Sequence, residues 1–249
     1  MAIERIDFLK VPLDIVAPEE LEQVVLDLLT REGPQHIMLV SLWDVLRARR
    51  RGEFRSMVTS AALVLPTSRS LIRGVYFLKK SRPVRYYPFS LIISLLGILE
   101  KYYKTIYLLG AQQRSLLQTE KNVRITFPHL GIVGRFAGYY HKSMERNLMT
   151  AIVKSHPSIV LIGDGIPGGQ KWIQRNRSKL HSGIYLWDKD VIDIFSERKR
   201  RVSEKTFEKG MEYFPKILKN PFRIFRFFQY IWYNILLVCY RLFRISNKS

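Results

Sequence analysis

A glycine-rich loop, GDGIPGGQ at residues 163–170, directly follows the short apolar run SIVLI at residues 158–162. An apolar run of this length, closed by glycines, predicts a buried strand, a loop and then a helix that begins at Pro167. Glycine allows a phosphate to approach the backbone closely, and the N-terminus of the following helix favours negative charge. The loop is therefore a candidate site for a nucleotide or a sugar phosphate, with a plain strand-to-helix turn as the alternative.

Other residues that could bind a ligand follow further apolar runs. Close backbone approach to a diphosphate needs no particular side chain, so the strongest candidates are Gly110, Gly134, Gly163 and Gly165. Tyr139 and Tyr140 could stack on a base or a sugar, with packing at the edge of the core as the alternative. Asp188, Asp190 and Asp193 could bind a cation, although this spacing also marks a solvated helix start. The five histidines show no metal-ligand spacing, so no metal is expected.

The elements that would position these residues alternate between strand and helix. Near-continuous apolar strands predict an α/β fold: a Rossmann-like, mostly parallel sheet with helices on both faces. The expected strands lie at residues 6–8, 36–41, 61–65, 105–109, 158–162 and 183–187, with a further strand–glycine–helix unit at 123–134. The expected helices lie at residues 18–31, 43–51, 71–80 and 89–101.

The chain is strongly basic, with a formal net charge of +20 over 249 residues. Residues 198–249 hold 13 Lys and Arg against 3 acids, so half of the excess lies there. Between Arg226 and Arg241 lie 14 uncharged, mostly aromatic and apolar residues, whereas spanning a bilayer takes about 20. The strand–helix alternation stops at this end of the chain. We therefore expect an α/β domain at residues 1–201 and a C-terminal helical, membrane-associating appendage at residues 202–249.

A basic and aromatic tail of this kind predicts a helix on an anionic membrane surface. The alternatives are a helix docked on the core and a dimer contact, which would make the protein a homo-oligomer. No nucleic-acid partner is expected, because zinc-ligand spacing and RNP-like aromatic motifs are missing. The single cysteine, Cys239, and an N-terminus without a secretory pattern predict a cytoplasmic protein, unless the tail holds it to a membrane.

Six segments, in their order along the chain, resemble the WecG/TagA/CpsF family, glycosyltransferase family 26, over about residues 30–245. They are ALVLP at 62–66, YLLGA at 107–111, GIVGRFAGYY at 131–140, IGDGIPGGQKWI at 162–173, DIFSERKRRV at 193–202 and GMEYFPKILKNPFRIFR at 210–226. The resemblance implies transfer of an N-acetylhexosamine-type sugar from a UDP-sugar to an undecaprenyl-diphosphate-linked sugar. It also implies inversion at the sugar, without a required metal or other cofactor.

The resemblance, taken with the residue chemistry above, places two sets of contacts. Substrate binding is expected at Arg85, Gly110, Gly134, Tyr139, Gly163, Asp164, Gly165, Gln170 and Asp193. Lys216, Arg223 and Arg226 fall where the family places basic residues that meet the lipid diphosphate. The expected partners are thus a UDP-sugar, a polyprenyl-diphosphate-linked sugar and an anionic membrane surface.

The catalytic loop departs from the family pattern. Family members carry an aspartate, proposed as the general base, just after the strand that resembles residues 62–66; this chain reads PTSRS, with Thr67 or Ser68 at that place. An alcohol cannot act as a general base at neutral pH without a partner of its own. Either the base comes from elsewhere, or the protein is a non-catalytic relative that binds nucleotide-sugar, lipid or a partner enzyme. Candidates for a replacement base are Asp164, Glu100, Glu53, His129 and His141.

Overall fold

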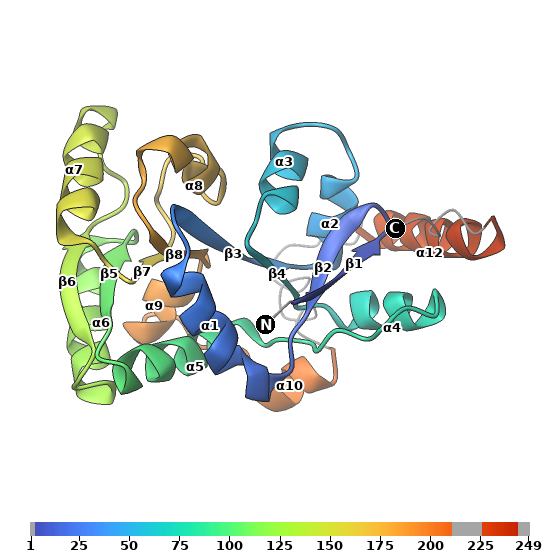
Figure 1. Ribbon diagram of the computed structural model, residues 1–249, viewed down its shortest axis with the longest axis horizontal. Coiled ribbons are helices and arrows are strands. Elements are labelled where there is room, and N and C mark those ends of the chain that lie inside the picture. Colours follow the sequence, from blue (N-terminus) through green and yellow to red (C-terminus); the bar gives the residue numbers. More distant parts are fainter. Residues whose placement is uncertain (1–2, 211–225, 244–249) are drawn as a thin grey trace.

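The computed structural model describes residues 3–210 and 226–243, and its centre is a six-stranded parallel sheet (Figure 1). In spatial order the strands are β4 (Leu63–Pro66), β3 (Pro34–Val40), β8 (Gly183–Trp187), β7 (Ile159–Ile162), β5 (Thr105–Leu109) and β6 (Gly131–Phe136). A separate antiparallel pair consists of β1 (Glu4–Phe8) and β2 (Val11–Ile15). The α-helices are α1 (Leu21–Thr30), α2 (Leu42–Ala48), α3 (Glu53–Thr59), α4 (Arg69–Phe77), α5 (Pro88–Lys101), α6 (Gln113–Thr126), α7 (Glu145–Ser155), α8 (Lys171–Arg175), α9 (Val191–Phe195), α10 (Glu204–Glu208) and α12 (Arg226–Leu242).

Helices cover both faces of the sheet, because successive residues of a strand point to opposite sides. In β7, Ile159 and Leu161 pack on one face with α1, α5, α6 and α9, whereas Val160 and Ile162 pack on the other face with α7 and α8. On this second face, α2, α3 and α4 cover β3 and β4, and α12 packs on α4. Burial on both sides explains the continuous apolar runs of the sequence. The predicted α/β fold with a mostly parallel sheet is confirmed.

The hairpin of β1 and β2 lies beside the edge strand β4. The buried carboxylate of Asp14 accepts two hydrogen bonds from the Arg5 guanidinium, at 2.6 and 2.8 Å, and one from the Val64 amide, at 2.6 Å. The carboxylate thus accepts a hydrogen bond from an amide of the edge strand β4, on the side where the described part of the chain has no further strand of the sheet to pair with it. The strand predicted at residues 6–8 is confirmed as part of β1, whereas β2 was not predicted. Pro12 interrupts the apolar run of β2, and proline is typical of strands outside the centre of a sheet.

Two predictions near the glycine loops were wrong. Residues 123–126 do not start a strand but end α6, and Val123 is fully buried in the core; a short apolar run is equally consistent with a buried helix. The helix after the 163–170 loop begins at Lys171 and not at Pro167. Gly168 and Gly169 between them have φ values of +82° and +54°, which are incompatible with a continuous right-handed helix.

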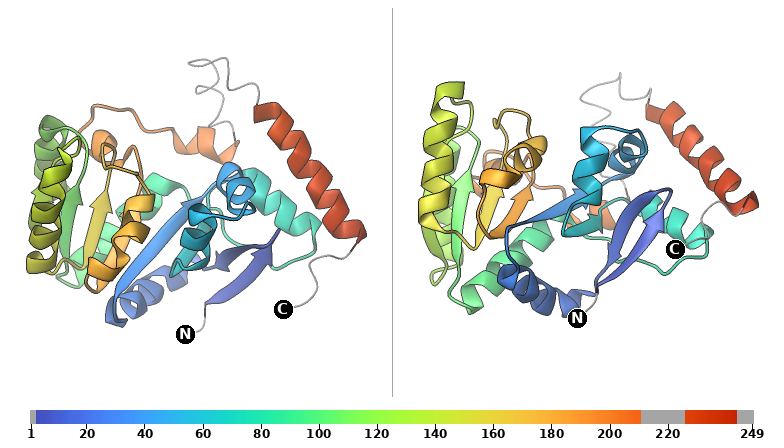
Figure 2. Two further views of the ribbon diagram at one scale, coloured as in Figure 1. Left: turned by 90° about the horizontal axis from the view of Figure 1, so that it is seen from above. Right: turned by 45° about the horizontal axis from the view of Figure 1, so that its top comes forward.

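The C-terminal helix α12 packs one face against the body of the protein and leaves the other face exposed (Figure 2). Tyr233 is buried, and its hydroxyl donates a hydrogen bond to the Ser70 carbonyl at 2.8 Å. A Cβ at Gly74 of α4 would lie 2.0 Å from that hydroxyl, so glycine is required there. On the opposite face, Phe228 and Trp232 are 66% and 57% exposed. Within the described residues, no helix is long and apolar enough to span a bilayer.

A buried histidine in β3 predicts a pH-dependent stability. Burial and the nearby charge of Arg177 lower the pKa of His36 to about 3, from an ordinary value of 6.5. The folded state therefore binds this proton only at a lower pH than the unfolded state does. The free energy of unfolding consequently falls as the pH drops from about 6.5 to 3, by up to ~1.4 kcal/mol per pH unit. We expect His36→Leu to reduce the loss of unfolding free energy between pH 7 and pH 5 by up to ~2 kcal/mol.

Urea unfolding curves at the two pH values measure this effect, with His129→Gln, at an exposed histidine, as the control. The control should lose as much stability as the wild type. Equal pH dependence in His36→Leu and the wild type would show that another group is responsible.

Candidate functional site

The loops at the carboxyl ends of β5 and β7 lie where the connections of the sheet diverge. From β5 the chain passes through α6 to β6 on one side, and from β7 it passes through α8 to β8 on the other side. The two helices pack on opposite faces of the sheet. Ligands of open α/β sheets bind in the crevice at such a switch point. Gly110 follows β5 here, and the 163–170 loop follows β7, as the glycine pattern predicted.

The glycine loops are packed against one another through their backbones. The amide of Ala111 donates to the Asp164 carbonyl at 2.6 Å, and the amide of Gly163 donates to the Leu109 carbonyl at 2.7 Å. A Cβ at Gly110 would lie only 2.8 Å from the Asp164 carbonyl oxygen. The close approach that requires glycine is thus one between loops, which supports the alternative of a tight turn. Diphosphate contact by Gly110 and Gly163 stays a prediction.

Three other predicted substrate residues, Gly134, Gln170 and Asp193, lie within regular elements or at the start of one. Gly134 lies inside β6, where a Cβ would be 2.4 Å from the ring of Tyr107. Gln170 stands at the start of α8. Asp193 lies on α9, and its Oδ1 is buried without a hydrogen-bond partner among the described residues. An unsatisfied carboxylate oxygen is costly unless a ligand or water supplies a donor, so Asp193 remains a candidate for substrate binding.

Tyr139, Asp164 and Gly165 come together at the mouth of the glycine loops. The Tyr139 amide donates to the Gly165 carbonyl at 2.7 Å, and the tyrosine ring lies where a Cβ of Gly165 would stand. Partial burial and the negative charge of Asp164 raise the pKa of Tyr139, which is 65% exposed. Lys189 Nζ lies 3.6 Å from Asp164 Oδ2. The exposed ring, the carboxylate and the ammonium form a polar edge to which a sugar or base could bind.

The loop after β4 has no group that could act as a general base. Thr67 Oγ1 donates to the Val40 carbonyl at 3.1 Å, and the buried Ser68 Oγ accepts a hydrogen bond from the Leu42 amide at 2.9 Å. Among residues 3–210 and 226–243, no carboxylate or imidazole forms a hydrogen bond with either hydroxyl. Arg85 Nε donates to the Thr67 carbonyl at 2.8 Å, so this arginine holds the loop in place. The loop geometry therefore offers positioning rather than proton transfer.

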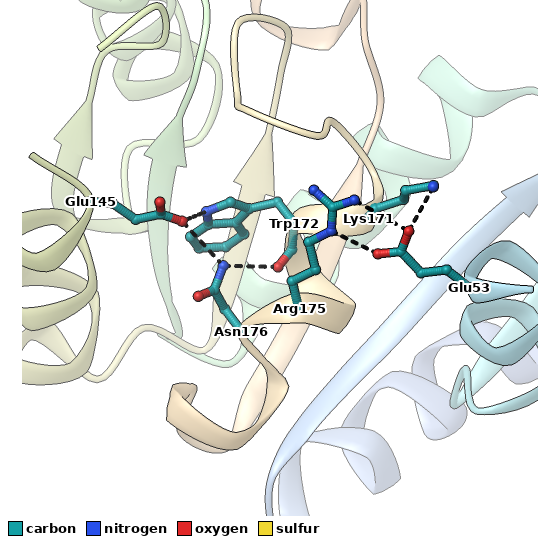
Figure 3. A network of polar contacts seen from close by, with 6 residues as sticks. All are labelled: Glu53, Glu145, Lys171, Trp172, Arg175 and Asn176. Atoms are coloured by element: carbon teal, nitrogen blue, oxygen red, sulfur yellow. Dashed lines mark hydrogen bonds and ion pairs between the residues drawn. The ribbon is translucent and has the colours of Figure 1, made fainter. Parts of the chain in front are cut away.

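Glu53, one candidate for the replacement base, is held in ion pairs with Lys171 and Arg175 of α8 (Figure 3). Its carboxylate accepts from Arg175 Nε at 2.7 Å and from Lys171 Nζ at 2.6 Å, and so joins α3 to α8. These two hydrogen bonds lower the pKa of Glu53 to about 2. A carboxylate with so low a pKa is a weak base, because efficient general bases have pKa values near the working pH.

The same close-up shows why Trp172 of the glycine loop segment is fixed (Figure 3). Its indole Nε1 donates to Glu145 Oε1 at 3.1 Å, and Asn176 donates to the Trp172 carbonyl at 3.0 Å. The ring itself is buried in the core between α7, α8 and the sheet. Trp172 is therefore a structural anchor of α8.

Position in the sheet separates the remaining base candidates. Glu100 ends α5 just before β5, and its carboxylate accepts from the amide of His129, which precedes β6; both residues lie at the amino edge of the sheet. Asp164 and the exposed His141 follow β7 and β6 at the carboxyl edge. Asp188, which follows β8 at this edge, was not predicted as a base, yet burial raises its pKa. An acid at the end of the central strand was the signal that could have found it.

Of the residues expected to meet a lipid diphosphate, Lys216 and Arg223 lie outside the described residues. Arg226 is the first residue of α12. These three assignments stay predictions.

Comparisons with known proteins agree on one family. The family described as "Glycosyl transferase WecG/TagA/CpsF family" matches residues 6–248. Two curated relatives share the name N-acetylglucosaminyldiphosphoundecaprenol N-acetyl-beta-D-mannosaminyltransferase. The Bacillus spizizenii relative is 23% identical over 176 residues, 71% of this chain and 68% of its own length, and the Bacillus subtilis relative is 22% identical over 172 residues, 69% and 66%. Because the family match extends over nearly the whole chain, the protein belongs to the WecG/TagA/CpsF family of glycosyl transferases.

Proposed function

We propose that this protein transfers an N-acetylhexosamine-type sugar from a UDP-sugar to a sugar on a polyprenyl diphosphate, in the synthesis of a cell-surface polysaccharide. The observation that carries the proposal is the family match over residues 6–248, in a fold whose glycine loops meet at a switch point. The names of the two relatives support an N-acetylglucosamine-bearing lipid diphosphate as the acceptor. In the proposed step, a base takes the proton of the acceptor hydroxyl, and the acceptor oxygen then attacks the anomeric carbon of the donor sugar. The bond between that carbon and UDP breaks, and UDP leaves with the bonding electron pair.

The base of this step would come from the carboxyl edge of the sheet. Asp164 and His141 remain as candidates. Glu53 forms ion pairs with Lys171 and Arg175, and Glu100 and His129 lie at the amino edge of the sheet. The exposed ring of Tyr139 and Asp193 Oδ1, which has no hydrogen-bond partner among the described residues, would supply contacts to the UDP-sugar donor. We propose no metal or other cofactor for the reaction.

Turnover of UDP-linked N-acetylhexosamines with a polyprenyl-diphosphate-linked N-acetylglucosamine tests the proposal. We expect radiolabelled sugar to move into the lipid fraction with at least one donor of a panel. UDP binding is measured in parallel by calorimetry. If UDP binds and no donor of the panel supports transfer, the second candidate function is favoured: a catalytically inactive family member that binds nucleotide-sugar, lipid or a partner enzyme. The observation behind this alternative is the loop at Thr67 and Ser68, whose hydroxyls have no carboxylate or imidazole partner within the described part of the chain.

We further propose that the protein is peripheral on the inner face of the cytoplasmic membrane, with the exposed face of α12 at the lipid surface. Exposed apolar residues recur on this face at helical spacing: Phe228, Ile231, Trp232, Ile235, Val238 and Leu242. Contiguous exposed apolar surface of this kind marks an interaction site, and aromatic residues favour the membrane–water interface. A self-association face is the alternative, and the two are separated by the membrane-binding prediction in the Discussion.

A further inference from the structure

A pocket of about 260 Å³ lies where α4 begins, at the carboxyl end of β4. Its wall includes Ser68, Arg69, Ser70 and Arg73, together with Lys209 beyond the end of α10 and Tyr230 from α12. Among the described residues that line it there are three cationic side chains and no carboxylate. The pocket, named here the α4 pocket, is thus a concentration of positive charge in a concave site.

The two arginines of the α4 pocket stand one helical turn apart. Residues four apart share a face of a helix, and like charges at this spacing repel each other unless an anion lies between them. No described carboxylate forms an ion pair with Arg69 or Arg73, whereas Arg5, Arg124 and Arg175 do have such partners. Unpaired cations in a recess are a feature of anion-binding sites, because the low-dielectric walls strengthen their field.

One of the two arginines is held in place by the protein. Arg69 Nη1 donates to the carbonyls of Lys209, at 3.0 Å, and Glu208, at 3.4 Å. These contacts fix the guanidinium at the pocket wall and join α4 to the segment after α10. The first turn of α4, which has nine residues, also directs its backbone amides and the positive end of its dipole toward this side.

We propose that the α4 pocket binds a diphosphate group. The volume is below the ~300–1,000 Å³ of sites that enclose a whole drug-sized ligand, so the pocket suits part of a larger molecule. The proposed function supplies two sources of this group, the UDP moiety of the donor and the polyprenyl diphosphate of the acceptor, and the inference rests on it for the identity of the source. The anion chemistry itself depends only on Arg69, Arg73 and Lys209.

Calorimetric titration of the full chain with inorganic pyrophosphate tests the proposal. We expect Arg73→Gln to weaken pyrophosphate binding at least ~fivefold, since a charge-assisted hydrogen bond is lost, and Arg73→Lys to keep most of it. Arg73 is exposed and its side chain forms no hydrogen bond or ion pair within the described part of the chain, so both variants should fold. Arg146→Gln on α7, at the far end of the molecule, is the matched control and should bind as the wild type does (Figure 1).

Two further titrations, with UDP and with farnesyl diphosphate as a short polyprenyl diphosphate, identify the source. Loss of UDP affinity alone in Arg73→Gln assigns the pocket to the donor, and loss of farnesyl diphosphate affinity alone assigns it to the acceptor. Unchanged binding of all three anions in Arg73→Gln, or absence of pyrophosphate binding to the wild type, would overturn the inference. Anion binding is measured without turnover, so a failed transfer assay would not affect the conclusion about the α4 pocket. If transfer is active but anion binding is unchanged in Arg73→Gln, the pocket inference is rejected and the proposed transferase function is kept.

Discussion

Replacement of Arg85 by alanine is expected to lower kcat/KM for sugar transfer at least ~tenfold. The Arg85 guanidinium joins two segments that are far apart in the chain: Nε donates to the Thr67 carbonyl at 2.8 Å, and Nη1 donates to the Phe207 carbonyl at 2.6 Å. It also lies 3.6 Å from the centre of the Phe207 ring. Hydrogen bonds from a charged group are worth about 1.5–3 kcal/mol, and 1.36 kcal/mol corresponds to a factor of ten in rate. Their loss would free the loop after β4 and the start of the C-terminal appendage together.

The kinetic pattern distinguishes positioning from a general loss of fold. We expect Arg85→Lys to fall between wild type and Arg85→Ala, because an ammonium keeps the charge but cannot make both directed contacts and stack on the ring. Arg82→Ala is the matched control: Arg82 is an exposed arginine three residues earlier, stacked on Tyr76 and remote from these contacts. Thermal melts report any loss of fold. Unchanged kcat/KM in Arg85→Ala would contradict the proposed role.

Removing aromatic side chains from the exposed face of α12 is expected to weaken binding to anionic vesicles more than tenfold. Full burial of a large apolar side chain is worth about 1.5–3 kcal/mol, so losing two of them, even from partial insertion, exceeds the 1.4 kcal/mol of a tenfold change. The variant is Phe228→Ser with Trp232→Ser. Both residues point away from the buried face at Tyr233 and Leu237, so the packing of α12 on α4 is kept.

Vesicle co-sedimentation measures this binding, with Tyr103→Ser/Ile125→Ser as a control that removes two apolar side chains elsewhere that are even more exposed, at 78% and 70%. The control should bind as the wild type does. Binding should also weaken at high salt, because basic residues near an anionic surface contribute about 1 kcal/mol each. The membrane proposal would be contradicted if the wild-type protein does not bind vesicles but dimerises in solution. If the Phe228/Trp232 variant is then monomeric, the self-association face is favoured.

The glycine loops show how far local pattern could predict the site. The strand over residues 105–109 was predicted to the residue, and the glycines after it and after β7 do meet at one edge of the sheet. Their purpose could not be predicted, because a glycine that admits a phosphate and a glycine that admits a neighbouring loop look the same in sequence. At Gly110 the structure shows a close approach between loops, because a Cβ there would lie 2.8 Å from the Asp164 carbonyl oxygen.

What the sequence by itself determined was the class of the fold and the family. Several continuous apolar runs of strand length, alternating with helical segments, favour a parallel sheet covered on both faces, and that pattern is local. The tertiary structure alone decided which charges meet. Glu53 was an equal candidate for a base until Lys171 and Arg175, more than a hundred residues later, proved to hold its carboxylate. Arg69 and Arg73 became a candidate anion site only when Lys209 came to face them. Such contacts depend on strand order and helix packing, which residue spacing along the chain does not encode.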